Sequence, residues 1–152
     1  MRIFIFILAV TVFGVWVEEI FSGVGAFVPA FVLLLQYGRV QSAFWASILW
    51  IFLQEGAGSL AFGGMTLFLA GIWVVFYMGN SFFERDNVFF MFSILFWGVI
   101  WRGVVVSTMI GLQDISAHSS FKSTEVVLLQ LIIYFLLFIV YTQGFKRFVL
   151  AK

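Results

Sequence analysis

The sequence predicts an all-α membrane protein: a polytopic bundle of about six transmembrane helices, two of them short. Composition is the first reason, because hydrophobic residues make up 64% of the 152 positions and charged residues only 10%. Soluble domains are roughly half apolar and a quarter charged, so this chain has too few polar side chains to cover a globule in water. The distribution of polar residues is the second reason, because they divide the chain into six apolar segments. We expect residues 1–152 to form a single integral membrane domain.

The six apolar segments differ in length, and two are too short to span a bilayer unaided. In chain order they cover residues 3–17, 26–37, 43–53, 65–83, 88–112 and 126–145. A spanning helix needs about 20 residues, which the first, fourth, fifth and sixth segments reach with modest flanks. In the second and third, about 14 residues cover about 21 Å, less than the roughly 30 Å hydrocarbon core. These two either borrow flanking residues, lie where the bilayer is thinned, or pack inside the bundle. Five spans plus a re-entrant element is the main alternative.

Charged residues end each of the first three segments. The first stops at the acidic pair Glu18 and Glu19. No small-x-small cleavage site precedes this pair, so we expect a membrane helix there rather than a signal peptide. The second segment contains Pro29 and ends at Arg39, and the third ends near Glu55.

Polar stretches separate the last three segments. Residues 84–87 are a charged cluster between the fourth and fifth, and residues 113–125 follow the fifth. The Ser-Thr-Glu run at 123–125 supplies a capping hydroxyl and an acid for the start of the sixth helix. A basic pair follows the sixth segment.

Lysine and arginine predict the orientation. With the N-terminus in the cytoplasm and loops counted alternately, only Lys122 lies outside and Arg102 lies within a span. The basic residues that fall inside are Arg2, Arg39, Arg85, Lys146, Arg147 and Lys152. This bias follows the positive-inside rule. It favours an even number of spans, with both termini in the cytoplasm.

Two ionisable residues lie within or at the end of apolar segments, where the bilayer makes charge costly. Glu55 ends the third segment, about 13 residues from its inner boundary, and Arg102 lies about 14 residues into the fifth. Both are therefore about 20 Å deep. Matching depth predicts an intramembrane polar pair, Glu55 with Arg102, in which the guanidinium offers two donors to the carboxylate. We interpret the pair as a structural clasp rather than a catalytic or transport site.

Small residues recur at a spacing of four, which lets membrane helices approach closely. Gly103, Ser107 and Gly111 share one face of the fifth segment, and Ser59 and Gly63 repeat the spacing in the stretch "LQEGAGSLAFGG". We treat these residues as candidates for helix packing or partner contact. The spacing does not distinguish contacts within the chain from contacts with another protein.

Several chemistries lack the residues that they need. The chain has no cysteine and a single histidine, His118, so we predict neither metal site nor haem. The sequence shows no phosphate-binding glycine loop, and we predict no cofactor and no nucleic-acid partner. Asp114, Ser116 and Ser119 lie near His118 in one polar stretch, which we interpret as a solvated loop rather than a catalytic triad. We therefore expect no enzymatic activity and no catalytic residues.

The central block "FVPAFVLLLQYGRVQSAFWASILWIFLQEGAGSLAFGGMTLFLAGIWVVFY" resembles the rod-shape-determining protein D (MreD) family. The resemblance rests on an ordered pattern. A proline-containing apolar run is followed by a short helix that ends in an acid, Glu55, with the small residues Gly58, Ser59 and Gly63 after it. Further spans and a basic tail complete the order. The family usually has Asp where this chain has Glu55, and Arg102 is not expected from its pattern.

The resemblance implies a non-enzymatic scaffold of the bacterial inner membrane. Members of the family belong to the cell-shape and peptidoglycan-elongation machinery, the elongasome. There they form hetero-oligomers with a bitopic coiled-coil partner, MreC, and with peptidoglycan synthases. The family fold is similar to the substrate-binding subunits of energy-coupling-factor transporters. That similarity supplies an alternative function, a vitamin-type small-solute binding subunit. A third alternative is an accessory subunit of another membrane complex.

Overall fold

The computed structural model describes residues 2–21, 24–56, 63–84, 87–113 and 124–150. Every regular element in these ranges is helical, which confirms the predicted all-α class. The elements are α1 (Arg2–Ile20), α2 (Phe27–Gln36), α3 (Val40–Gly56), α4 (Gly64–Asn80), α5 (Val88–Gln113), α6 (Thr124–Phe145) and the π-helix η2 (Lys146–Leu150). The six α-helices follow the six apolar segments in order. The main difference is that α3 is longer than expected, because its flanking polar residues are also helical.

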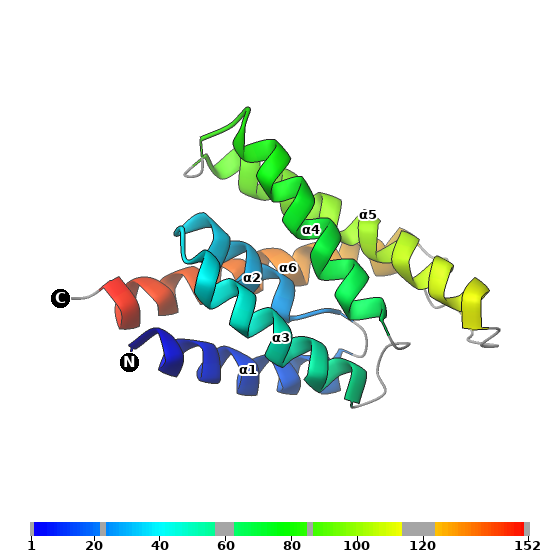
Figure 1. Cartoon of the computed structure of the whole chain (residues 1–152), viewed down its shortest axis with the longest axis horizontal. Helices are drawn as coiled ribbons and strands as arrows, with labels where there is room; N and C mark the ends of the chain where they lie inside the picture. The colour runs from blue at the N-terminus through cyan, green and yellow to red at the C-terminus, as the bar shows by residue number, and fades with distance from the viewer. Residues whose placement is uncertain (1, 22–23, 57–62, 85–86, 114–123, 151–152) are drawn as a thin grey trace.

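Helix α2 lies at the centre of the bundle and packs against all five other α-helices (Figure 1). Residues 27–35 are all buried. Its sequence, FVPAFVLLLQ, is apolar on every face, as expected of a helix surrounded by protein. Ten residues cover only about 15 Å, about half of the hydrocarbon core. The second segment therefore packs inside the bundle, which was one of the three arrangements expected for it.

Both ends of α2 have local features that suit a helix terminus. Pro29 lies in the first turn, where its missing N–H removes no helical hydrogen bond. At the other end Gly38 has φ +67°, the left-handed conformation that glycine adopts readily. The N–H of Arg39 donates to the carbonyl of Leu34 at 2.9 Å, and the N–H of Gly38 donates to that of Leu35 at 3.0 Å. These two bonds form a Schellman motif, so the carbonyls of Leu34 and Leu35 near the end of α2 are satisfied by backbone alone.

Three helical segments in the described ranges are long and apolar enough to cross a membrane: Arg2–Ile20, Phe89–Gly111 and Val127–Leu150. α4 is also apolar, but its 17 residues extend only about 26 Å. The outward face of α1 carries large apolar side chains, with Phe4 and Trp16 exposed by 67% and 69%. Such a surface suits lipid better than water. These features indicate a membrane protein.

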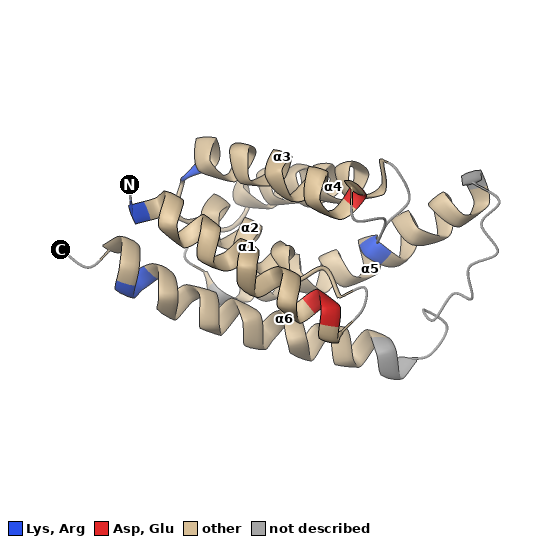
Figure 2. Ribbon diagram, turned by 90° about the horizontal axis from the view of Figure 1, so that it is seen from below, with Lys and Arg blue, Asp and Glu red and all other residues tan. Residues whose placement is uncertain are grey.

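Charge separates along the bundle. Lysine and arginine gather at the end that holds both termini, whereas the acids of α1 and α3 lie toward the opposite end (Figure 2). Helix α1 illustrates the separation, because it begins at Arg2 and carries Glu18 and Glu19 in its last turn. The blue segment within α5 is Arg102, the cation far from the basic end.

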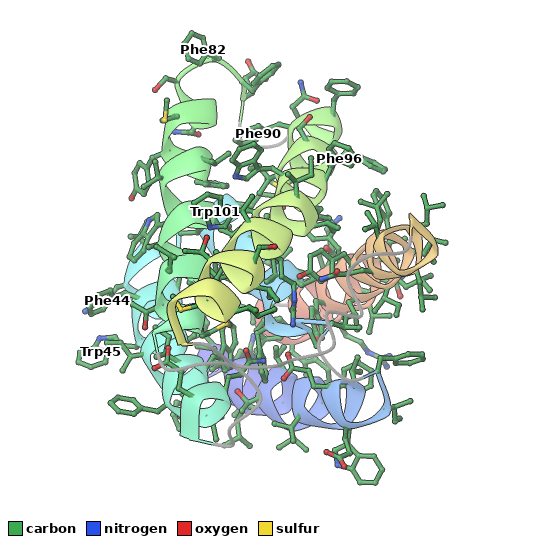
Figure 3. The ribbon with its side chains drawn as sticks, turned by 90° about the vertical axis from the view of Figure 1, so that its right-hand side faces the viewer. Phe44, Trp45, Phe82, Phe90, Phe96 and Trp101 are labelled. Atoms are coloured by element: carbon green, nitrogen blue, oxygen red, sulfur yellow. The ribbon has the colours of Figure 1, made fainter. Side chains whose placement is uncertain are left out.

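Glycines on α4 accommodate aromatic rings of α5. A Cβ atom at Gly71 would lie 2.0 Å from the indole Nε1 of Trp101, and one at Gly79 would lie 2.3 Å from a ring carbon of Phe90. Both rings lie between the two helices (Figure 3). The Trp101 indole donates to the carbonyl of Leu67 at 3.4 Å, which ties the ring to α4. The close approach of α4 and α5 therefore depends on glycines opposite large rings.

Candidate functional site

A cluster of polar side chains surrounds the segment that leads into α2, residues 24–26. Four helices contribute to it, and most of the side chains are buried. The cluster, called the α2 clasp below, consists of Glu18 from α1, Gln54 from α3, Arg102 from α5, and Gln130, Tyr134 and Tyr141 from α6. Buried polar groups are costly unless they find partners. Each of these six side chains has at least one polar contact with another member or with the backbone of residues 24–26.

Glu18 holds the start of α2. Its Oε1 accepts a hydrogen bond from the N–H of Ala26 at 3.0 Å and another from the side-chain amide of Gln54. Ala26 is the residue immediately before α2, where a carboxylate interacts favourably with the positive end of the helix dipole. Arg102 also interacts with the carboxylate electrostatically. One acid therefore links α1, α2, α3 and α5.

Helix α6 binds the same segment from the other side. The Gln130 amide donates to the carbonyl of Val24 at 3.0 Å and to the Tyr134 hydroxyl at 3.3 Å. The Tyr141 hydroxyl donates to the carbonyl of Ala26 at 3.4 Å. Buried backbone carbonyls need hydrogen-bond partners. Here side chains of α6 satisfy them inside the protein.

Arg102 packs directly against Gly25. Arg102 is 5% exposed, and a Cβ atom at Gly25 would lie 2.2 Å from its Nη1 and 2.9 Å from the Tyr134 hydroxyl. Gly25 also has φ +72°, so this position favours glycine for two independent reasons. The guanidinium interacts with the Tyr134 hydroxyl, and its Cζ lies 6.0 Å from the ring centroid of Phe68, within cation–π range. Its Nε has no hydrogen-bond partner among the described residues.

The structure does not bring together the predicted pair Glu55 and Arg102. Among the described residues Arg102 interacts with Glu18, whereas Glu55 accepts hydrogen bonds from the N–H and hydroxyl of Thr66 at 3.3 and 3.2 Å. Depth along a helix fixes one coordinate only, and the direction of each side chain around its helix decides the partner. The bonds to Thr66 join α3 to α4. Glu55 therefore ties the end of α3 to the first turn of α4.

The predicted small residues have different positions. Gly58 and Ser59 lie outside the described residues. Gly63 has φ +84° at the start of α4, and no atom lies within 4 Å of a Cβ built there. On α5, Gly103 is partly buried, while Ser107 and Gly111 are exposed, and a Cβ at Gly111 would meet open space. Gly111 therefore makes no close helix contact among the described residues.

Sequence reasoning missed most of the α2 clasp. Glu18 was interpreted as the end of a segment, although α1 continues to Ile20. The available signal was on α6, where Gln130, Tyr134 and Tyr141 recur at spacings of four and seven on one helical face. A polar stripe on an apolar helix indicates a polar partner inside the bundle.

The α2 clasp holds a backbone segment in place and has no recognisable reaction geometry. No group of three or more His, Cys, Asp or Glu side chains suited to a metal occurs within the described ranges. Asp114, Ser116, His118 and Ser119 lie outside those ranges. Comparison of the chain with known protein families, with curated proteins and with solved structures finds no match.

Proposed function

We propose that this chain is a non-enzymatic scaffold subunit of the bacterial cell-shape and peptidoglycan-elongation complex, as its resemblance to the MreD family implies. In this proposal it crosses the cytoplasmic membrane six times, with both termini in the cytoplasm. It binds a bitopic partner of the MreC type and, through the assembled complex, peptidoglycan synthases. The gathering of basic residues at the end that holds both termini supports this orientation.

The observation that carries the proposal is the outer surface of α4. Two shallow apolar grooves, of about 430 and 380 Å³, lie side by side along it and share Ala70 and Val74. Aromatic rings border them, including Trp73 on one side and Trp97 on the other. A small residue between two grooves lets a partner helix approach closely, which is how membrane helices associate without a hydrophobic driving force. The surface suits one transmembrane helix.

The placement of the polar groups also supports a scaffold. The α2 clasp uses its side chains to fix α2, and none of them lines the two α4 grooves. A solute-binding subunit needs polar groups that converge on a cavity. One observation favours that alternative function nevertheless: the Nε of Arg102 is buried without a hydrogen-bond partner among the described residues.

Affinity purification in a mild detergent tests the proposal. We expect a tagged chain to recover a stoichiometric single-span protein with a coiled coil outside the membrane, and we expect depletion of the chain to round the cells. The variant Ala70→Trp should abolish recovery of the partner, because an indole there fills both grooves. The matched control is Leu128→Trp, which adds the same ring to an exposed position of α6 (55% exposed) and should leave recovery unchanged.

Different results would support the other functions. Recovery of an ATPase module alone, together with a small molecule retained through purification, would establish the solute-binding subunit. A different stoichiometric membrane complex would make the chain an accessory subunit of that complex. If Ala70→Trp keeps the single-span partner, the outer surface of α4 is not its binding site.

A further inference from the structure

A third groove, separate from α4 and from the α2 clasp, opens between α5 and α6 at the basic end of the bundle. Its volume is about 540 Å³. One wall consists of Met91, Phe92 and Leu95 near the start of α5, and Phe138 and Ile139 of α6 belong to the other. The side chains of Phe92 and Ile139 are 43% and 47% exposed. The groove is therefore accessible from the surface that faces lipid.

The lining changes from apolar to polar along the groove. Along α6 it runs from Phe135 through Phe138 and Ile139 to Thr142 and then to Lys146, the first residue of η2. These residues share one helical face, and the distance from Phe135 to Lys146 is about 17 Å. One leaflet of the hydrocarbon core is about 15 Å deep, half of the roughly 30 Å total. The groove therefore matches the length of one leaflet.

The polar end of the groove is positively charged. Lys146 is exposed there, and Gln36 at the end of α2 lines the same end. Arg147 follows Lys146 in η2. The carbonyls of Leu34 and Leu35 near this end are already bonded to the backbone of Arg39 and Gly38. A phosphate placed here would thus meet the ammonium group of Lys146 and the side-chain amide of Gln36.

We propose that this groove binds an anionic phospholipid from the leaflet at the end that holds both termini. One acyl chain lies between α5 and α6 against Phe92 and Ile139. The phosphate is held by Lys146, with the Gln36 amide as a hydrogen-bonding neighbour. A net negative headgroup is selected because the groove offers a cation and none of its lining residues is an acid.

Delipidated protein in detergent tests this binding site. Dioleoyl phosphatidylglycerol and dioleoyl phosphatidylcholine are titrated separately, and binding is measured by native mass spectrometry and by the rise in thermal unfolding temperature. We expect phosphatidylglycerol to bind more tightly and to stabilise more. Lys146→Gln should weaken its binding about fivefold, since one basic residue contributes about that factor to anionic lipid binding. Ile139→Trp should abolish binding of both lipids by filling the groove.

Two controls separate the groove from general attraction to basic residues. Arg147→Gln removes the adjacent cation, which does not line the groove, and should change binding less than twofold. Leu136→Trp adds the same ring as Ile139→Trp to an exposed site on α6 (58% exposed) outside the lining of the groove. This control should leave lipid binding unchanged. Equal binding of the two lipids, equal losses from Lys146→Gln and Arg147→Gln, or full binding to Ile139→Trp would each overturn the proposal. Stabilisation by inorganic phosphate alone would also overturn it, because the acyl chain would then be unnecessary.

Discussion

Substitution of Gly25 by alanine tests the α2 clasp most directly. Two costs apply at this position. The left-handed backbone, φ +72°, costs an alanine about 1–2 kcal/mol. The new Cβ would lie 2.2 Å from Nη1 of Arg102, so the guanidinium must move. It is the flexible end of a side chain, but it is buried, and displacing it leaves polar groups unsatisfied at about 1–3 kcal/mol. We expect Gly25→Ala to destabilise the protein by about 2–5 kcal/mol.

Two other glycines separate these costs. Gly63 has φ +84° but no atom within 4 Å of a Cβ, so Gly63→Ala should cost only the backbone contribution, about 1–2 kcal/mol. Gly111 is helical, and a Cβ there meets open space. Gly111→Ala should be neutral or stabilising by up to about 1 kcal/mol, because alanine favours helix.

The free energies of unfolding are measured by titrating a denaturing detergent into mixed micelles and following helical circular dichroism. In an Arg102→Gln background, Gly25→Ala should cost less than in the unsubstituted protein, because the clash with the guanidinium is absent and only the 2.9 Å approach to the Tyr134 hydroxyl remains. If Gly25→Ala costs no more than Gly63→Ala in the unsubstituted protein, the contact with Arg102 carries no energy. The reasoning about the clasp would then fail.

Three further substitutions address the buried charge and the packing of α4 on α5. Glu18→Gln and Arg102→Gln should each destabilise the bundle, because either single change leaves a charge without its counterpart. The double variant should be less destabilised than the sum of the two single effects, by a coupling energy of about 0.5–3 kcal/mol. Glu19→Gln, at an exposed neighbour, should change stability by less than about 0.5 kcal/mol. Gly71→Ala should cost about 1–3 kcal/mol through overpacking and shift the fluorescence of Trp101, since the added methyl would lie 2.0 Å from the indole nitrogen.

The outcomes that contradict these expectations are specific. Additive effects of Glu18→Gln and Arg102→Gln would show that the two charges do not interact. For the packing substitution, Gly144→Ala is the matched control, because its Cβ would lie 3.8 Å from Phe6, an ordinary contact. Equal stability of the Gly71 and Gly144 variants would show that Trp101 moves at no cost.

Hydropathy was enough to predict the order and approximate bounds of the helices, because each apolar segment folds as one helix between polar residues. It also included the observed arrangement of α2, packing inside the bundle, among three alternatives. The all-apolar sequence of α2 leaves no face for water. Hydropathy could not predict the partner of Arg102. Residue spacing gives depth along one helix, but helix α1 brings Glu18 to the clasp through the tertiary arrangement. Which side chains meet across a bundle depends on helix rotation and crossing, and spacing does not specify these.

Glycines show the same limit from another direction. The four-residue spacing selected Gly103, Ser107 and Gly111, yet Gly71 and Gly79 are the residues that meet α5. They were not recognised because their partners are the rings of Trp101 and Phe90. A single glycine can make room for a ring without any repeat of small residues. A four-residue spacing rule finds helices whose backbones approach closely along several turns. It misses single glycines placed opposite one large side chain.

The position of α2 connects these features to a scaffold. Its two ends are held by different means: the α2 clasp fixes the first, and a backbone motif around Gly38 closes the second. Since α2 packs against every other α-helix, its fixed position restrains the bundle as a whole. A partner helix on α4 and a lipid between α5 and α6 would then bind surfaces supported by the same central helix. Preformed surfaces of this kind reduce the ordering cost of association, which is what a subunit that binds without performing chemistry requires.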